Sequence, residues 1–296
     1  MFMTERIEKL IKQLKSKEYK KLRRVEEEPG MEELYTLDGY VKIFKAFIEK
    51  ETPIIHQGDN FGFNISVSYK PGQLSGNYTP NYYRVLTCGL DEIRREVVEK
   101  VSKEECEEKI QFGKAMLECL DVFLKLCEDY RKLAEKQGNK QLYAALCKVP
   151  HKGAESFYEA CVFMKICIYF LRAGFTNHLG LGRFDQYMYP FYKRDKENGK
   201  TNEELLEVLE EFFISLNKDT DLYRGVQQGD NGQSMVIGGF DKNGNSMFNE
   251  LSRLCMEASL ELNLIDPKIN LRVGKNTSDE IYELGTRLTQ KGLGFP

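Results

Sequence analysis

The sequence predicts a predominantly helical α/β fold in which short parallel strands are joined by helices. Two apolar runs, 234–239 and 269–273, are each entered from a loop and followed by a helical pattern. A strand, a helix and a second strand in succession favour parallel pairing through a right-handed crossover. The helix expected at 154–171 is apolar on nearly all sides, so we expect it at the centre of the molecule.

Most of the remaining chain shows helical periodicity. Near the N-terminus, Ile7, Leu10 and Leu14 are spaced as on one face of a helix. Ser102 and Thr201 each begin a capping-box pattern, which marks a helix start. We expect helices at 4–24, 37–51, 81–100, 102–137, 154–171, 201–217, 245–263 and 277–291. The first half is therefore expected to contribute only helices, and two strands are too few for a complete sheet.

The composition excludes several classes of protein. The 296 residues carry a net charge of −3, so no basic field exists to hold nucleic acid. Lys165 and Arg172 interrupt the densest apolar run, which is shorter than the roughly 18 residues of a membrane span. Eight cysteines without a CxxC pair suit reduced thiols in the cytoplasm. The three histidines are dispersed, so no metal site is predicted.

One stretch, 181–192, has neither helix nor strand periodicity. It combines five aromatic rings with charged and amide groups. Rings of this number are expected to be buried, and a buried charge requires a partner. Arg183 and Asp185 are therefore expected to bind other groups. A structural ion pair is the favoured interpretation, and lining of a pocket is the alternative.

Three further motifs have ordinary explanations. The glycines around Asp230 are not followed by the GK[ST] of a phosphate loop. Asp241 and its neighbours lack the glycine and the bidentate acid of a calcium loop, so a turn is expected. Cys88 has no histidine nearby in the sequence and is interpreted as an inert, buried thiol.

Several blocks, in order along the chain, resemble the pyruvate formate-lyase family of glycyl radical enzymes. The block 181–192 reads LGRFDQYMYPFY, and 149–160 reads VPHKGAESFYEA. The other blocks are TERI at 4–7, GNYTPNY at 76–82, VIGG at 236–239 with NELS at 249–252, and NLRV at 270–273 followed by KNT at 275–277. The resemblance covers nearly the whole chain.

The resemblance implies a ten-stranded α/β barrel built from two half-barrels and surrounded by helices. The chain then corresponds to a truncated family domain over 1–296, the N-terminal half of the barrel. Residues 1–150 are its mostly helical outer layer, and 151–296 supply the first half-barrel strands and helices. In this family an S-adenosylmethionine and iron–sulfur activating enzyme installs a glycyl radical, which oxidises a barrel cysteine, and the thiyl radical attacks the substrate. The barrel keeps water away from these radicals.

The resemblance also implies what this chain lacks. Family members are more than twice as long, and the radical cysteine and radical glycine would lie downstream of this chain. Cys88 is not at the radical-cysteine position. No catalytic residue and no bound cofactor are therefore predicted here, and the chain alone is not expected to turn over substrate.

Five residues are predicted to belong to the substrate pocket: Asn77, Gln233, Ser234, Arg183 and Asp185. Pyruvate enzymes of the family place arginines near the positions of Ser75 and Asn77, where this chain is neutral. This difference favours a radical lyase, dehydratase or decarboxylase over a formate C-acetyltransferase proper, which remains an alternative. Asn77 can hydrogen-bond a substrate hydroxyl or carbonyl, but it cannot serve as a general base.

Partners follow from the same resemblance. They are a small-molecule substrate, a radical-activating enzyme and a separate C-terminal half polypeptide, and a homodimer is left open. The alternative outside the enzymes is a non-catalytic protein, either a truncated product or an assembly subunit. An unrelated helical scaffold that matches the blocks by chance is the third alternative.

Overall fold

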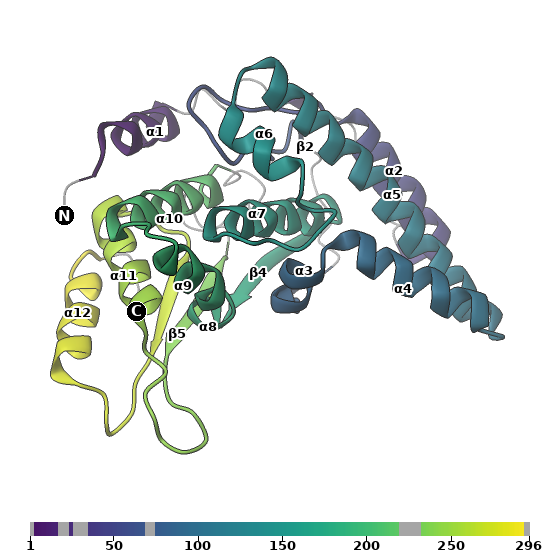
Figure 1. The fold of residues 1–296 in the computed structure, drawn as a ribbon. Coiled ribbons are helices and arrows are strands. Elements are labelled where there is room, and N and C mark those ends of the chain that lie inside the picture. Colours follow the sequence, from purple (N-terminus) through teal and green to yellow (C-terminus); the bar gives the residue numbers. More distant parts are fainter. Residues whose placement is uncertain (1–2, 17–23, 26–34, 69–74, 219–231, 293–296) are drawn as a thin grey trace.

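The computed structural model describes residues 3–16, 24–25, 35–68, 75–218 and 232–292. Within these ranges most residues are helical, as Figure 1 shows. The helices are α1 (Glu5–Ser16), α2 (Leu37–Lys50), α3 (Tyr82–Cys88), α4 (Leu90–Lys103), α5 (Glu107–Lys136), α6 (Lys140–Leu146), α7 (Phe157–Ala173), α8 (Phe184–Tyr187), α9 (Tyr189–Glu197), α10 (Asn202–Leu216), α11 (Glu250–Leu262) and α12 (Asp279–Thr289). The strands are β1 (Arg24–Val25), β2 (Val67–Ser68), β3 (Ser75–Tyr78), β4 (Thr176–Gly182), β5 (Ser234–Gly238) and β6 (Lys268–Arg272).

The main sheet has the order β3-β4-β5-β6, and every neighbouring pair is parallel. A separate parallel pair joins β1 to β2. The predicted parallel pairing of the two C-terminal strands is confirmed, because Met235 pairs with Ile269 in register. Helix α11 makes the crossover between them.

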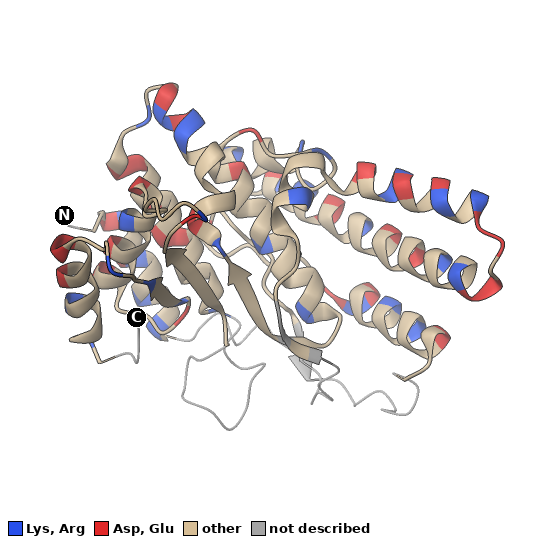
Figure 2. Ribbon diagram, turned by 90° about the horizontal axis from the view of Figure 1, so that it is seen from below, with Lys and Arg blue, Asp and Glu red and all other residues tan. Residues whose placement is uncertain are grey.

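Helices cover one face of the main sheet. Met235 and Ile237 of β5 and Ile269 of β6 are fully buried, as are Leu179 and Leu181 of β4. Alternate residues of a strand point to opposite faces, so these side chains define the face toward the helices. Figures 1 and 2 show α7 and α10 on this side, and no described helix lies over the opposite face.

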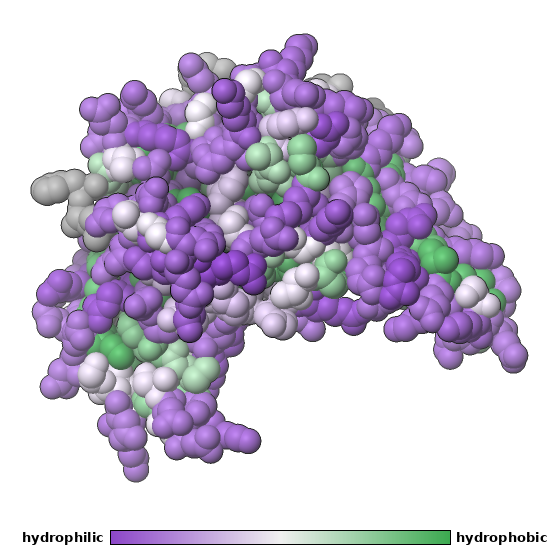
Figure 3. Space-filling model, in the orientation of Figure 1, coloured by the Kyte–Doolittle hydropathy of each residue, from purple (hydrophilic) through white to green (hydrophobic). Residues whose placement is uncertain are grey.

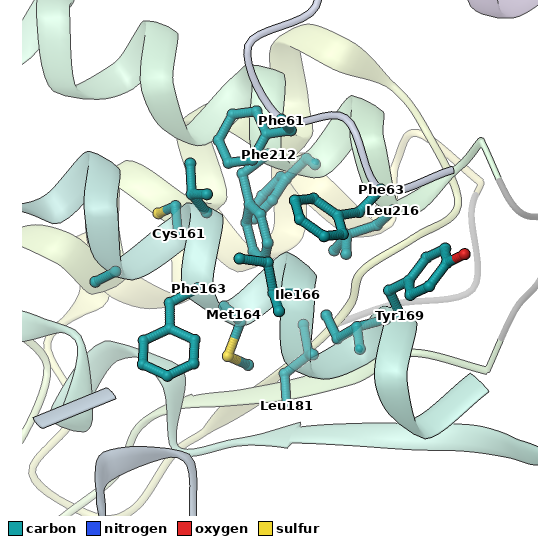
Figure 4. Packing of buried hydrophobic residues seen from close by; sticks show 14 of the residues in the cluster. Phe61, Phe63, Cys161, Phe163, Met164, Ile166, Tyr169, Leu181, Phe212 and Leu216 are labelled. Carbon is teal, nitrogen blue, oxygen red and sulfur yellow. The ribbon is translucent and has the colours of Figure 1, made fainter. Parts of the chain in front are cut away.

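Helix α7 lies at the centre of the core, as its uniformly apolar sequence predicts. Ser156 and Glu159 form the capping box that begins it. Figure 4 shows side chains of α7 packed between rings from the 51–66 segment, residues of α10 and Leu181 of β4. Phe63 stacks on Tyr130 with ring centroids 4.1 Å apart. This packing anchors the β4 end of the sheet to the helical layer.

A buried ion pair joins the segment after α2 to the end of α10. Lys218 Nζ lies 2.6 Å from Asp59 Oδ2, and both side chains are almost completely buried. Asp59 Oδ1 also accepts hydrogen bonds from the backbone N–H groups of Phe61 and Gly62. Burial by itself would raise the pKa of Asp59, but Lys218 and these donors lower it below its usual value.

The prediction that the first half contributes only helices is wrong. Strand β3 pairs with β4, although its sequence SGNY has little apolar or β-branched character. Strand β4 was also missed, because its sequence TNHLGLG contains two glycines and precedes the aromatic stretch. Both strands form through backbone pairing that strand propensity does not report.

Several helix boundaries also differ from the prediction. Helix α4 continues to Lys103, and α5 begins after Cys106 without a side-chain cap, so the capping box predicted at Ser102 does not form. Gly89, with φ of 81°, separates α3 from α4. Helix α6 was not predicted, and Cys88 is partly exposed rather than buried.

Candidate functional site

The uncovered face of the main sheet carries a row of polar residues from neighbouring strands. Ser234 pairs with Gly180 on one side and with Lys268 on the other. Ser234 and Lys268 alternate with the fully buried Met235 and Ile269, so they face away from the helices. Gly180 has no side chain. The row therefore places a hydroxyl and an ammonium group beside a gap in the side-chain layer.

His178 and Gly232 approach each other next to this row. His178 adopts a left-handed backbone conformation with φ of 53°, which is uncommon for a residue with a side chain. Gly232 has φ of 66°, and a Cβ atom at this position would lie 2.0 Å from His178 Nδ1. Only glycine therefore permits this approach. Strained backbone of this kind often occurs at functional sites.

The residues predicted from the resemblance lie around the same place. Asn77 stands in β3 between residues that pair with Asn177 and Leu179, so its register partner is His178. Gln233 directly precedes β5, and its backbone carbonyl accepts a hydrogen bond from the N–H of Lys268. The structure thus places Asn77 on β3 and Ser234 on β5, the two strands that flank β4 in one sheet, and Gln233 directly precedes Ser234.

Gln233 is a buried polar side chain with an unused acceptor. Its side chain is 1% exposed, and its Oε1 atom has no hydrogen-bond partner in the described part of the chain. An unsatisfied buried carbonyl oxygen is costly unless water or a ligand donates to it. By strand alternation the Gln233 side chain lies on the side of Met235, opposite to Ser234 and Lys268.

Arg183 and Asp185 both bind the backbone of one residue, Gly238. Arg183 Nη2 donates to the Gly238 carbonyl over 2.6 Å, and Asp185 Oδ2 accepts from the Gly238 N–H over 2.7 Å. The two side chains fasten the end of β5 to the turn after β4. The expectation that they meet partners is confirmed, although the partners are backbone groups of Gly238 and not each other. Lining of the pocket by this pair stays a prediction.

Asp185 also holds the beginning of α11. Ser252 Oγ donates to Asp185 Oδ2 over 2.6 Å, and Asn249 Nδ2 donates to the Asp185 carbonyl. Asp185 is completely buried, and this burial raises its pKa, while the hydrogen bonds from Ser252 and Gly238 act in the opposite direction. The carboxylate therefore joins α8 to the end of β5 and to the beginning of α11.

A large apolar cavity lies away from this sheet, among the outer helices α2, α4 and α5. It has a volume of about 340 Å³, and its lining includes Phe112 and Met116, which are both exposed. Figure 3 shows hydrophobic side chains at this far end of the molecule. Among its lining side chains only the Tyr40 hydroxyl and the Cys119 thiol offer polar hydrogens. Such a lining is better suited to contact with other apolar side chains than to binding of a polar substrate.

Sequence reasoning missed two residues of the polar face, His178 and Lys268. The histidines match no metal-ligand spacing in the sequence, and the apolar run that predicts the second strand begins only at residue 269. The alternation of Lys268 with the apolar Ile269 and Leu271 was a signal that could have placed it on the uncovered face.

Two features are absent from the described residues. They contain no group of three or more His, Cys, Asp or Glu side chains arranged to hold a metal ion. None of the described helices is long and apolar enough to cross a membrane. Of the motifs with ordinary explanations, Asp241 forms the expected turn by accepting from the N–H groups of Asn243 and Asn245.

A family model described as "Pyruvate formate lyase-like" matches residues 9–296. The chain belongs to the pyruvate formate lyase-like family. Its homologues are glycyl radical enzymes, as the resemblance of the sequence blocks implies. Glycyl radical enzymes are activated by an S-adenosylmethionine and iron–sulfur activase.

Two similar curated proteins define the range of activities among these homologues. The chain is 26% identical over 246 residues to (2S)-3-sulfopropanediol dehydratase from Klebsiella oxytoca, which covers 75% of this chain and 30% of that protein. It is 27% identical over 252 residues to the 4-hydroxyphenylacetate decarboxylase glycyl radical subunit from Clostridium scatologenes, which covers 75% of this chain and 28% of that protein. The match thus spans less than a third of either relative.

Solved structures show the same fold. The B12-independent glycerol dehydratase from Clostridium butyricum superposes with a TM-score of 0.82 at 19% identity, over 100% of this chain and 50% of that one. Hydroxyproline dehydratase from Clostridioides difficile superposes with a TM-score of 0.82 at 15% identity, over 98% of this chain and 50% of that one. The chain spans about half of each structure, and its parallel sheet and helices are consistent with part of an α/β barrel.

Proposed function

We propose that this chain is the N-terminal part of a glycyl radical enzyme of the lyase, dehydratase or decarboxylase type, and that it supplies the first half of the barrel. The single observation that supports this most is the uncovered polar face of the parallel sheet. A face with Ser234 and Lys268 is unsuited to packing against an apolar layer, whereas the interior of a substrate-binding barrel requires such groups.

The proposed roles follow from position. Asn77, Gln233 and Ser234 are proposed to belong to the substrate pocket, with the hydroxyl of Ser234 on the uncovered face. Arg183 and Asp185 hold β5 in place beside them through Gly238. Substrates of the relatives, such as sulfopropanediol and 4-hydroxyphenylacetate, suggest a small oxygenated organic compound.

In this proposal, the groups that carry the radical are supplied by other polypeptides. The thiyl cysteine and the radical glycine are supplied by a C-terminal half polypeptide, and the activating enzyme generates the radical. We place the assembly in the cytoplasm. By itself the chain is expected to have no turnover.

The test is reconstitution of a glycyl radical. The chain is mixed anaerobically with a C-terminal family polypeptide, the activating enzyme, S-adenosylmethionine and a reductant, and the radical is measured by electron spin resonance. Val236→Trp places a large ring on the uncovered face and is expected to abolish the signal. Val98→Trp, at an exposed site on α4, is the matched control. A signal that is indifferent to Val236→Trp, or absent with every such partner, refutes the proposal.

A second candidate function is a non-catalytic assembly subunit. Its support is the edge strand β6, whose Asn270 and Arg272 side chains are exposed. An unpaired sheet edge favours association with another strand. This alternative predicts concentration-dependent self-association in gel filtration, and a monomer with a cooperative melt at all concentrations contradicts it.

A further inference from the structure

We propose that the apolar groove between α2, α4 and α5 is a docking site for an amphipathic helix of another polypeptide, one in which lysine or arginine residues flank the apolar stripe. The groove is the cavity of about 340 Å³ among the outer helices, and no element of the described ranges fills it. Because it lies away from the polar face of the sheet, this inference is independent of the proposed function.

Three helices each turn an apolar stripe toward the groove. The lining residues are Leu37, Tyr40, Val41 and Phe44 of α2, Leu90, Ile93 and Val97 of α4, and Phe112, Met116 and Leu120 among those of α5. Within each helix they are three or four positions apart, so they share one face. Phe44 and Phe170 also line the groove, and their ring centroids lie 5.4 Å apart, which joins the groove to the core.

Helix α4 is the least covered wall of this groove. None of its residues is buried, although one side of it is apolar. It packs closely on α5 at Gly113, where a Cβ atom would lie 2.3 Å from Val101 Cγ2. This contact leaves Ile93 and Val97 only half-buried at the groove. A further helix in the groove would bury them and complete a four-helix arrangement, as in the recognition of amphipathic helices by apolar grooves.

The mouth of the groove joins an apolar surface to an acidic one. The side chains of Phe112 and Met116 are 57% and 44% exposed. Glu108 lies four positions before Phe112 on the same face of α5, and Glu105 and Glu107 flank the start of this helix. Figure 2 shows the turn between α4 and α5 as an acidic tip of the molecule. A helix that follows the groove outward therefore passes from apolar side chains to carboxylates.

The charge of this tip specifies the partner. Positions 99–109 hold five glutamates and three lysines, and two of these lysines are engaged, since Lys103 binds Glu99 over 2.6 Å and Lys109 binds Glu104 over 3.5 Å. The excess negative charge is complementary to a helix with lysine or arginine beside its apolar stripe. A second copy of this chain, with a net charge of −3, brings no excess of positive charge.

The experiment measures binding of synthetic helical peptides to the purified chain. Each peptide has about 16 residues, the span from Glu105 to Leu120. The first carries leucines three and four positions apart with lysines at both ends, the second has glutamates in place of the lysines, and the third has the lysines but scrambled leucines. Binding is followed by fluorescence anisotropy at low salt and at about 0.5 M salt.

The lysine peptide is expected to bind at least about tenfold more tightly than the glutamate peptide at low salt, since two or three surface ion pairs amount to about this factor. High salt should narrow the difference, and the scrambled peptide should not bind. A photoreactive leucine in the lysine peptide should cross-link to the lining of the groove.

Two sets of variants locate the site. Met116→Lys should weaken binding of the lysine peptide at least about tenfold, because it sets a charge against an apolar stripe. Glu105→Lys combined with Glu108→Lys should reverse the preference between the two charged peptides. The matched controls Tyr282→Ser and Glu283→Lys, at exposed sites on α12, should change neither. Circular dichroism and melting curves check folding, and Phe112→Ser replaces Met116→Lys if that variant unfolds.

Four results overturn the inference. The first three are equal binding of the lysine and glutamate peptides, unchanged binding in the folded Met116→Lys or Phe112→Ser variant, and no binding of the lysine peptide to the wild-type chain. The fourth is self-association of the chain in analytical ultracentrifugation that Met116→Lys abolishes, because the occupant is then a second copy.

Discussion

Glu210 of α10 makes the stability of this protein depend on pH near neutrality. Its side chain is 2% exposed and hydrogen-bonded to Glu261 of α11. Burial, followed by repulsion from Glu261 and Glu207, raises the pKa of Glu210 to about 8. The folded protein therefore holds a proton on Glu210 that the unfolded chain, with a glutamate pKa of about 4.3, releases.

The sign and size of the effect follow from linkage. A carboxyl whose pKa is raised on folding stabilises the fold most at low pH, and this contribution is lost as pH rises from about 4.3 to about 8. One unit of pKa corresponds to about 1.4 kcal/mol. The loss is about 1 kcal/mol at pH 5 and about 4.6 kcal/mol at pH 8, so stability falls by about 3.5 kcal/mol between these values through this one group.

Glu210→Gln removes the titration and keeps the shape and a hydrogen-bond donor. We expect the free energy of unfolding of this variant, relative to wild type, to rise by about 3.5 kcal/mol between pH 5 and pH 8. The assay is urea unfolding followed by circular dichroism at half-unit pH steps. Glu283→Gln, at an exposed site on α12, is the control and should give a constant offset. If the wild type and Glu210→Gln curves stay parallel across this range, the assigned protonation is wrong.

Three other substitutions test local parts of the structure. Gly232→Ala is expected to destabilise by about 1–2 kcal/mol, because of its positive φ and its collision with His178, and His178→Ala in the same chain should recover part of the loss in urea unfolding. Ser252→Ala should cost about 1–3 kcal/mol in the same assay, since it removes a donor from a buried carboxylate, and an unchanged midpoint contradicts that role. Asp59→Asn or Lys218→Met alone should cost about 3–5 kcal/mol in thermal or urea unfolding at neutral pH. The Asp59→Asn deficit should shrink as pH falls from about 3.9 through the lowered pKa of the folded Asp59, because the unfolded wild-type chain takes up a proton in this range before the folded one does. A deficit independent of pH contradicts the ion pair.

Some of this protein could be predicted because the signals are local. The apolar helix α7, the capping box of α10 and the parallel strands β5 and β6 all show patterns of adjacent residues, namely apolar periodicity and capping side chains. The block that contains Arg183 and Asp185 also predicts a buried polar segment, because its aromatic rings require burial and its charges require partners. In these places the chemistry of a short stretch determines its conformation, and the structure agrees.

The tertiary structure decided the rest. Strands β3 and β4 exist because their backbones pair across about a hundred residues of chain, and backbone hydrogen bonds leave no mark in side-chain patterns. The partner of Arg183 and Asp185 is a glycine on a distant strand, which no charge pattern could indicate. His178, Ser234 and Lys268 lie on successive strands of one sheet only because strand register is set by non-local contacts, so the sequence determined which groups are available and the sheet determined which of them share a face.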